Sequence, residues 1–340
     1  MKTSTALKLL AAIILMIAVI LGTKKGGLTR AASEKTDFAM GTVVNVKIYG
    51  IGNTDEQAAK AIRSIKRLDQ TISWRKDSDL ANLNSSYEVG KKNEIDKDLY
   101  EAISKAYEIC KASDGALDIT IRPLANLWNI EEASNEDFKV PTEDEIKEVL
   151  QDVGYDNIII EEDGVIIKKE GMIIDLGSVG KGYALDIVKK QLDRDKVGGA
   201  NVSVGGSILV YGRKPTKENW RVGIRNPKGT VDDYIGFVSI EPNKTTFIST
   251  SGDYEKYIEK DGKKYHHILN PKTGVCAESE YASVSIICDN GLVSDGLSTA
   301  CFILGYEKSL PLLEKYNASA IFIDKNNEVK IVGDVKFFSK

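Results

Sequence analysis

The chain has 340 residues, enough for one large domain or two modest ones with an ample hydrophobic core. Its 42% apolar and 28% charged residues are those of an ordinary folded protein. The net charge is -4 and Lys and Arg are scattered, which argues against nucleic acid as a partner because binding to phosphate backbones needs a concentrated basic face.

The N-terminal segment differs from the rest of the chain. An unbroken apolar run, LLAAIILMIAVILG, follows Lys2 and Lys8, the charge arrangement of a secretory signal. We expect residues 1–22 to be an uncleaved signal anchor in the cell membrane and residues 23–36 to be a polar tether, with the folded part outside the cytoplasm. A cleaved secretory signal is the second interpretation, and a cytoplasmic protein with an amphipathic start is the third.

Three amphipathic helices are predicted in the first half of the folded part. They cover residues 55–72, 98–113 and 141–154 and follow a strand at 42–50. The last of them opens with a capping box formed by Thr142 and Glu145. The apolar stripe of the first helix consists of Ala58, Ile62, Ile65, Leu68 and Ile72.

Short β-rich runs fill the middle of the chain. A hairpin is predicted at Asp163-Gly164, and strand patterns continue in ANVSVGGSILVYG, NWRVGIRNP, YIGFVSIE, TTFISTSG, KKYHHILN and YASVSIICD. Helical patterns return at residues 289–304 and 306–316, before a closing β pair around Asn326-Asn327. This order predicts an α+β fold with a largely antiparallel sheet, and no linker composition divides residues 37–340.

The four cysteines show no zinc-type spacing. Each lies in an apolar or mixed segment, so we expect mostly buried thiols, and the sequence leaves a disulfide open. The four are Cys110, Cys276, Cys288 and Cys301.

A glycine-rich segment, DLGSVGKGYALD at residues 175–186, lies between a predicted strand and a helical pattern. Its three glycines permit tight turns and let backbone N–H groups approach an anion, and a helix N-terminus adds positive potential. The spacing is neither that of a P-loop nor a clean GxGxxG. Both a phosphate-binding turn and a plain strand–helix turn are compatible with it.

A late segment, VSDGLSTACFILG at residues 293–305, contains Asp295 and Thr299. If the segment is helical, these side chains are one turn apart and project from the same face. A carboxylate with a hydroxyl is hard-oxygen ligation suited to Mg²⁺, which often completes its shell with substrate phosphate. The alternative is that Asp295 merely caps the helix.

Two further segments carry polar groups in unusual places. In SDGALDITIRPLANLWN, residues 113–129, Asp118 stands between apolar residues and needs either a structural hydrogen bond or a ligand amide. In KKYHHILNPKTG, His266 and His267 are the chain's two histidines. On a strand they face opposite sides, so at most one of them faces any given site.

In their order along the chain, these segments resemble the ApbE family of FAD:protein FMN transferases. The likeness runs from about residue 38 to the C-terminus. It comprises Met40-Gly41-Thr42, SDLANLN, DGALDITIRPLANLWN, DLGSVGKGYALD, NVSVGGSILVYG, the stretch from STSGDYEKYI to KKYHHILNPKTG, and SDGLSTACFILG.

The resemblance implies a single ApbE-like catalytic domain over residues 37–340 that cleaves the FAD pyrophosphate with Mg²⁺. The FMN half would move to a Thr or Ser hydroxyl of an acceptor protein as a phosphoester, and AMP would leave. An N-terminal membrane anchor or signal is usual in that family. Its usual acceptors are extracytoplasmic flavin-carrying subunits of electron-transfer complexes.

The resemblance also implies roles for particular residues. Asp295, Thr299 and a backbone carbonyl near Ser178 would hold Mg²⁺, and the glycine-rich turn would hold the phosphates. His267 would be the general base for the acceptor hydroxyl, a task that suits an imidazole, and His266 would be incidental. The positions that would contact FAD are Met40, Trp74, Ala116, Leu117, Asp118, Asp175, Lys181 and Leu269.

The sequence leaves two residue roles and the reaction itself open. Lys181 lies where relatives can carry an acid, and Asn270 stands where many members have Asp, so no carboxylate partner of His267 can be named. A metal-dependent FAD pyrophosphatase, which would use water as the nucleophile, fits the same site. So does a flavin-binding protein without turnover.

Overall fold

The computed structural model describes residues 31–340 except 51, 76 and 231. The expected signal anchor lies outside these residues, and among the helices that are described none is long and apolar enough to cross a membrane. The predicted C-terminal boundary of the tether is wrong. Residues 31–36 begin strand β1 (Ala31–Ala39), which pairs with β2 (Thr42–Gly50), and an ion pair of 2.8 Å between Glu34 and Lys47 joins the two strands.

An eight-stranded sheet, counted over the described residues, forms the centre of the molecule, with the order β1-β2-β6-β7-β10-β13-β14-β15. Every neighbouring pair is antiparallel, which confirms the predicted fold class. The remaining strands are β6 (Gly199–Val204), β7 (Ser207–Gly212), β10 (Thr246–Gly252), β13 (Tyr281–Cys288), β14 (Ser319–Asp324) and β15 (Val329–Val332).

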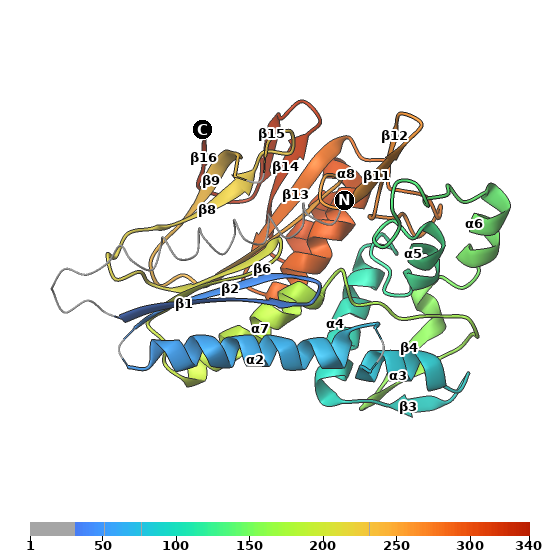
Figure 1. Ribbon diagram of the computed structural model, residues 1–340, viewed down its shortest axis with the longest axis horizontal. Coiled ribbons are helices and arrows are strands. Elements are labelled where there is room, and N and C mark those ends of the chain that lie inside the picture. The colour runs from blue at the N-terminus through green and yellow to red at the C-terminus, as the bar shows by residue number, and fades with distance from the viewer. Residues whose placement is uncertain (1–30, 51, 76, 231) are drawn as a thin grey trace.

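Three helices cover one face of this sheet, as Figure 1 shows: α2 (Thr54–Ile72), α7 (Gly180–Arg194) and α8 (Gly291–Lys315). The predicted apolar stripe of α2 is buried. The two late helical patterns form one element, α8, which is kinked at Gly305 (φ 74°, ψ 179°). This positive φ is accessible to glycine at little steric cost.

A three-stranded sheet covers the opposite face. It consists of β8 (Trp220–Arg225), β9 (Tyr234–Ile240) and β16 (Phe337–Ser339), in the order β16-β9-β8. Its apolar side chains pack on Val210, Ile248 and Ile321, whereas the next residues along those strands, such as Leu209 and Phe247, face the helices. The alternation is that of strands buried on both faces.

A second region adjoins one end of the sheet, at the right of Figure 1. It contains α4 (Lys97–Ala112), whose residues belong to the same core as the sheet, and the predicted hairpin at Asp163 (φ 59°). The capping box of Thr142 and Glu145 is formed. The other elements are α3 (Asp79–Ser86), α5 (Arg122–Trp128), α6 (Glu143–Leu150), η1 (Tyr155–Asn157), β3 (Lys92–Glu94), β4 (Ile158–Glu161), β5 (Gly164–Ile167), β11 (Tyr257–Lys260) and β12 (Lys263–His266).

The strand expected directly before the glycine-rich turn is wrong. Residues 172–176 belong to no sheet, because their backbone groups bond elsewhere. The Asn84 amide bonds both the N–H and the C=O of Ile174 at 2.8 Å, and the Asp175 N–H donates to the Ile119 carbonyl at 2.7 Å. A side-chain amide thus replaces a neighbouring strand.

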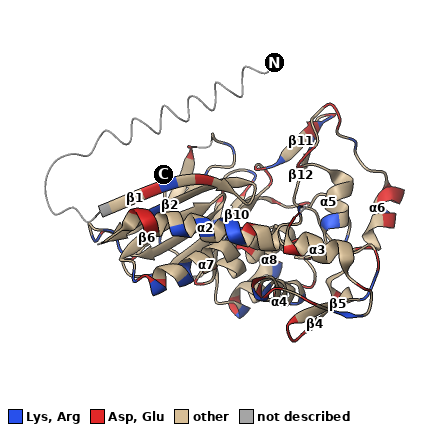
Figure 2. Ribbon diagram, turned by 60° about the horizontal axis from the view of Figure 1, so that its bottom comes forward, with Lys and Arg blue, Asp and Glu red and all other residues tan. Residues whose placement is uncertain are grey.

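The cysteines and the charged side chains are distributed as the sequence predicts. All four cysteines are free, three of them are buried and Cys276 is half-buried. In Figure 2 the Lys and Arg side chains are interspersed with Asp and Glu along the described elements.

Candidate active site

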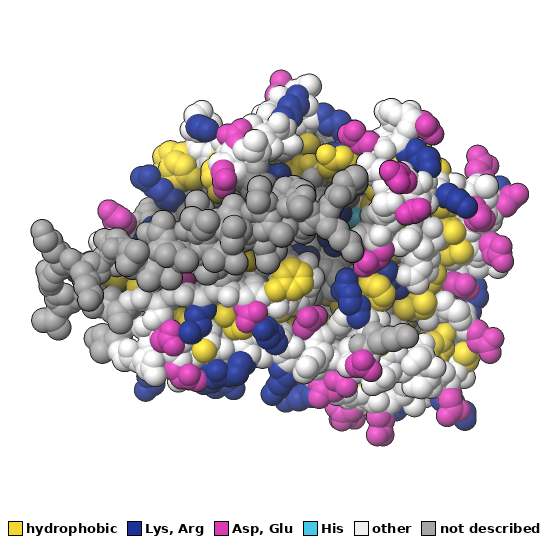
Figure 3. All heavy atoms as spheres, viewed as in Figure 1, with side chains coloured by type: hydrophobic (Ala, Val, Ile, Leu, Met, Phe, Trp, Pro, Cys, Tyr) yellow, Lys and Arg dark blue, Asp and Glu magenta, His cyan; other side chains and the backbone are white. Residues whose placement is uncertain are grey.

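A cavity of about 310 Å³ lies where the sheet and its helices meet the second region. In Figure 3 a small area of histidine side chain is visible at this junction. All twelve residues that were expected to form the site line the cavity: Met40, Trp74, Ala116, Leu117, Asp118, Asp175, Ser178, Lys181, His267, Leu269, Asp295 and Thr299. The fold therefore brings together residues that the sequence separates by more than two hundred positions.

Asp295 lies in the first turns of α8 and is 3% exposed. One carboxylate oxygen accepts from the Gly182 N–H at 2.9 Å and the other from the Ser207 hydroxyl at 3.1 Å. The helix cap is Asn290, whose side chain accepts from the Val293 N–H, so the alternative in which Asp295 caps the helix is wrong. A buried carboxylate facing a cavity is a candidate cation ligand.

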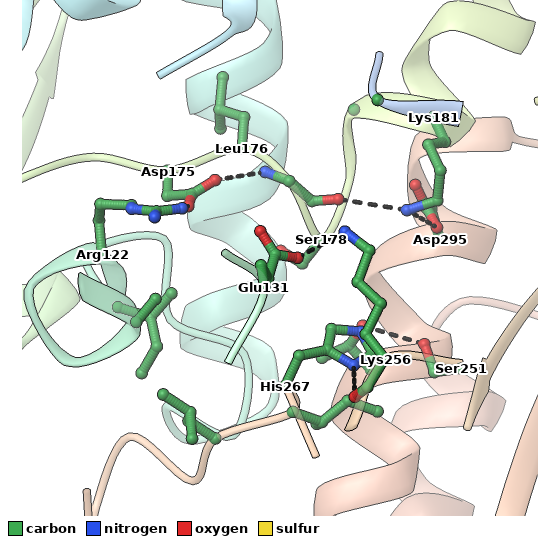
Figure 4. Close-up of a pocket in the computed structure, with 18 of the residues that line it drawn as sticks. Arg122, Glu131, Asp175, Leu176, Ser178, Lys181, Ser251, Lys256, His267 and Asp295 are labelled. Carbon is green, nitrogen blue, oxygen red and sulfur yellow. Dashed lines mark hydrogen bonds and ion pairs between the residues drawn. The ribbon is translucent and has the colours of Figure 1, made fainter. Parts of the chain in front are cut away.

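Hydroxyl-bearing residues and a lysine line the same cavity as this carboxylate. Thr299 lies one helical turn further on, and its hydroxyl is 3.1 Å from that of Ser251. Ser178 stands half-buried on the turn that precedes α7. The Lys181 Nζ lies 3.3 Å from the Gly177 carbonyl and 3.7 Å from Asp295 Oδ1, between the turn and α8 (Figure 4).

The donor set fits Mg²⁺ in chemical type. Asp295, Thr299 and the Ser178 carbonyl offer oxygen atoms, and the carboxylate already has one cationic neighbour, the Lys181 ammonium at 3.7 Å. Within the described part of the chain, no three His, Cys, Asp or Glu side chains gather as a ready-made metal site. An ion here would therefore rely on water and substrate phosphate to complete its shell.

The N–H groups of the three glycines in the turn are already bonded within the protein. The Gly177 N–H donates to Asp175 Oδ1 at 2.7 Å, that of Gly180 to the Leu176 carbonyl at 2.7 Å, and that of Gly182 to Asp295 at 2.9 Å. These three N–H groups are therefore engaged within the protein, and the prediction that the turn holds phosphate rests on its other groups.

Asp175 and Trp74 both contact Arg122, a buried arginine that the sequence analysis missed. The Arg122 guanidinium donates to Asp175 Oδ2 at 3.2 Å, and its carbon lies 3.5 Å from the centroid of the Trp74 ring. Both oxygens of Asp175 thus have partners in the protein. An isolated charge within the apolar run ITIRPL was a usable signal, the same one that drew attention to Asp118.

Asp118 makes structural hydrogen bonds. Its carboxylate accepts from the Thr120 N–H at 2.8 Å, the Thr120 hydroxyl at 2.6 Å and the Tyr155 N–H at 2.9 Å. Burial raises the pKa of the Asp118 carboxyl in spite of these donors. The carboxylate ties the cavity wall to the turn before β4, and a ligand amide could use the remaining lone pair.

The two histidines face different surroundings. His267 lines the cavity, and its Nδ1 lies 3.2 Å from the Lys256 carbonyl, which can only accept. The proton is therefore assigned to Nδ1, and Nε2 keeps a free lone pair. Desolvation lowers the pKa of His267, although the Glu131 carboxylate opposes this effect, so the ring is neutral at neutral pH and can accept a proton.

His266 points into the protein interior. It is 7% exposed, its Nε2 lies 3.1 Å from the Ala277 carbonyl, and its ring meets Phe302 edge-on at 5.8 Å. Its surroundings are structural, and it does not line the cavity.

Glu131 and Lys256 form a cavity-lining ion pair of 2.7 Å beside His267, as Figure 4 shows. Lys256 therefore contacts His267 through its carbonyl and Glu131 through its ammonium. The sequence offered no signal for this pair, because its members are 125 residues apart and each lies in a polar segment.

The remaining residues that were expected to contact FAD form an apolar part of the cavity wall. Met40 occupies the turn between β1 and β2 with φ 53°, where its N–H donates to Asp69 at 2.8 Å. Ala116, Leu117 and Leu269 are each at most 5% exposed and leave little of their surface to the cavity.

The sequence profile of the ApbE family matches residues 40–322, most of the chain. The chain belongs to the ApbE family. This ApbE protein is 30% identical over 314 residues to the FAD:protein FMN transferase of Haemophilus influenzae, covering 88% of this chain and 89% of the relative. It is 31% identical to the one of Treponema pallidum over 327 residues, covering 90% and 88%.

Solved structures agree with the family assignment. The ApbE protein of Thermotoga maritima superposes with a TM-score of 0.79 at 31% identity, covering 88% of this chain and 96% of that one. The flavin transferase ApbE of Vibrio cholerae gives a TM-score of 0.77 at 26% identity, covering 89% and 96%. The fold of this ApbE protein is thus shared along almost its whole described length.

Proposed function

We propose that this ApbE protein is an Mg²⁺-dependent FAD:protein FMN transferase. A Thr or Ser hydroxyl of an acceptor protein attacks the phosphorus of the FMN half of FAD. The bridging P–O bond breaks, AMP leaves with the electron pair, and FMN stays on the acceptor as a phosphoester. The observation that carries the proposal is the meeting of Asp295, Thr299, the Ser178 turn and His267 around one cavity.

His267 takes the proton of the acceptor hydroxyl on Nε2. Its neutral state and the Nδ1 bond to the Lys256 carbonyl leave that nitrogen unprotonated and fix the plane of the ring. The Lys256 carbonyl thus orients the imidazole, a role that a carboxylate has beside many catalytic histidines. A carboxylate partner in direct contact is therefore not required for this histidine to act.

Asp295, Thr299 and the Ser178 carbonyl hold Mg²⁺ in this proposal. When bound, the ion neutralises charge on the phosphoryl oxygens and on departing AMP. Lys181, whose ammonium lies 3.7 Å from Asp295, turns from that carboxylate to the phosphates as FAD enters. The walls formed by Met40, Trp74, Ala116–Asp118, Asp175 and Leu269 receive the rings and ribityl chain of FAD.

We also propose that residues 1–22 anchor the protein in the cell membrane with the catalytic part outside the cytoplasm. The support is the apolar run between Leu9 and Gly22 and the lysines before it. The acceptor would then be an extracytoplasmic electron-transfer subunit with an exposed Thr or Ser.

The test uses envelope proteins from cells that lack this protein. They are incubated with the purified protein, FAD and Mg²⁺, and examined by in-gel flavin fluorescence and mass spectrometry. We expect a fluorescent band whose Thr or Ser carries an FMN adduct, together with AMP. Free FMN and AMP without a labelled band would instead identify a pyrophosphatase, and intact FAD would refute both activities.

A further inference from the structure

Arg122, the first residue of α5, is 6% exposed at the wall of the cavity. Its Nε donates to the Asn126 side chain at 2.7 Å and its Nη1 to Asp175 Oδ2 at 3.2 Å. These bonds fix the plane of the guanidinium. The guanidinium carbon lies over the Trp74 ring, 3.5 Å from the ring centroid.

A distance of 3.5 Å is direct contact between two flat groups, so Arg122 occupies one face of the indole. A planar ring of FAD therefore cannot stack on that face. The Arg75 guanidinium carbon also lies over the ring, at the longer distance of 4.9 Å from its centroid. Trp74 stands in the short connection after α2, a place where an aromatic ring without a backing contact would sample several rotamers. The guanidinium restricts the indole to one orientation before a ligand arrives.

The same guanidinium fixes the start of the glycine-rich turn. Asp175 is 8% exposed, and a carboxylate in such a place needs a charged partner or several donors. Arg122 holds one of its oxygens and the Gly177 N–H holds the other. Figure 4 shows Arg122 and Asp175 on the side of the cavity across from Lys181 and Asp295.

We propose that Arg122 is the positioning residue of the FAD site. It holds the Trp74 ring in one orientation at the wall of the cavity that would receive FAD, and it holds Asp175 and the start of the glycine-rich turn beside that ring. This inference rests on the proposed function, since it assumes that FAD is the ligand. It assigns no contact between Arg122 and the reacting atoms.

The test is a double-mutant cycle on FAD binding, measured by flavin fluorescence with the full-length protein. The variants are Arg122→Lys, Trp74→Leu and the double substitution. Arg122→Lys keeps a positive charge for Asp175 but loses the planar group over the indole and the two-point hydrogen bonding. We expect it to weaken FAD binding about tenfold, whereas in the Trp74→Leu protein the same change should cost less than about twofold.

A matched control is Arg221→Lys. Arg221 also lies over an aromatic ring, that of Phe237 at 4.8 Å, but on β8, away from the cavity. This substitution should leave FAD affinity unchanged. Thermal melting of each variant establishes that the folded protein is being compared.

The outcomes separate the inference from the proposed function. Wild-type protein that fails to bind FAD would refute both. A second outcome is that the wild-type protein binds FAD but Arg122→Lys weakens this binding equally with and without the Trp74 indole. Arg122 would then act on the structure in general, and only the inference would be overturned. Unchanged affinity in Arg122→Lys would overturn it as well.

Discussion

Substituting the two adjacent histidines one at a time is expected to separate an effect on the transfer rate from an effect on the stability of the fold. His267→Ala removes the unprotonated Nε2 that faces the cavity. A positioned general base contributes about 10²- to 10⁴-fold, which corresponds to about 2.7–5.4 kcal/mol of activation free energy. We expect a loss of transfer rate in this range, measured in single-turnover reactions with saturating FAD, and little change in FAD affinity.

His266→Ala should have the opposite signature. It deletes a buried ring that bonds to the Ala277 carbonyl and packs edge-on against Phe302. The loss of one buried hydrogen bond and its packing costs about 1–3 kcal/mol of unfolding free energy, which lowers the melting temperature by several degrees while the transfer rate of the folded protein is kept. If the His266 variant lost transfer and the His267 variant kept it, the assignment of the base would be wrong.

Asp295→Ala should abolish both Mg²⁺-dependent turnover and Mn²⁺ binding followed by electron paramagnetic resonance, and full activity would remove Asp295 from the metal site. Lys181→Met should tighten Mn²⁺ binding about tenfold without FAD, because it removes a positive charge 3.7 Å from Asp295; equal affinities would contradict that competition. The transfer rate should be constant near neutral pH and fall as pH drops through the lowered pKa of His267, where the base becomes protonated. Glu131→Gln should move this acid limb to still lower pH, because the carboxylate raises the pKa of His267, and a limb that moves upward would exclude that role. Gly182→Ala should lower the melting temperature, since a Cβ there would overlap the backbone of α8, and a fully stable variant would be inconsistent with this close crossing.

The sequence predicted features that depend on neighbours along the chain. The stripe of α2, the capping box of Thr142 and the hairpin at Asp163 are all present, because helical spacing, caps and left-handed turn residues act over a few positions. The shared face of Asp295 and Thr299 follows from the same helical geometry, and both line the cavity.

Features set by distant contacts could not be predicted in this way. The polar start of β1 is a strand because β2 supplies its partners, and residues 172–176 are not a strand because Asn84 supplies theirs. The pairing of Glu131 with Lys256 depends on the fold, which brings the segment after α5 against the segment before β11. The resemblance to a known family located the site, but it named neither these residues nor Arg122.

The crossing of α7 and α8 shows how glycines position the carboxylate that is expected to bind the cation. Gly182 and Gly291 lie where α7 crosses α8, and a Cβ on either would overlap the carbonyl oxygen of the other. The absence of side chains lets the two helices approach until the Gly182 N–H reaches the Asp295 carboxylate. These glycines therefore serve an anion, as the pattern indicates, but the anion is the protein's own. What they position is the carboxylate that a cation would bind, with the Lys181 ammonium 3.7 Å away from it.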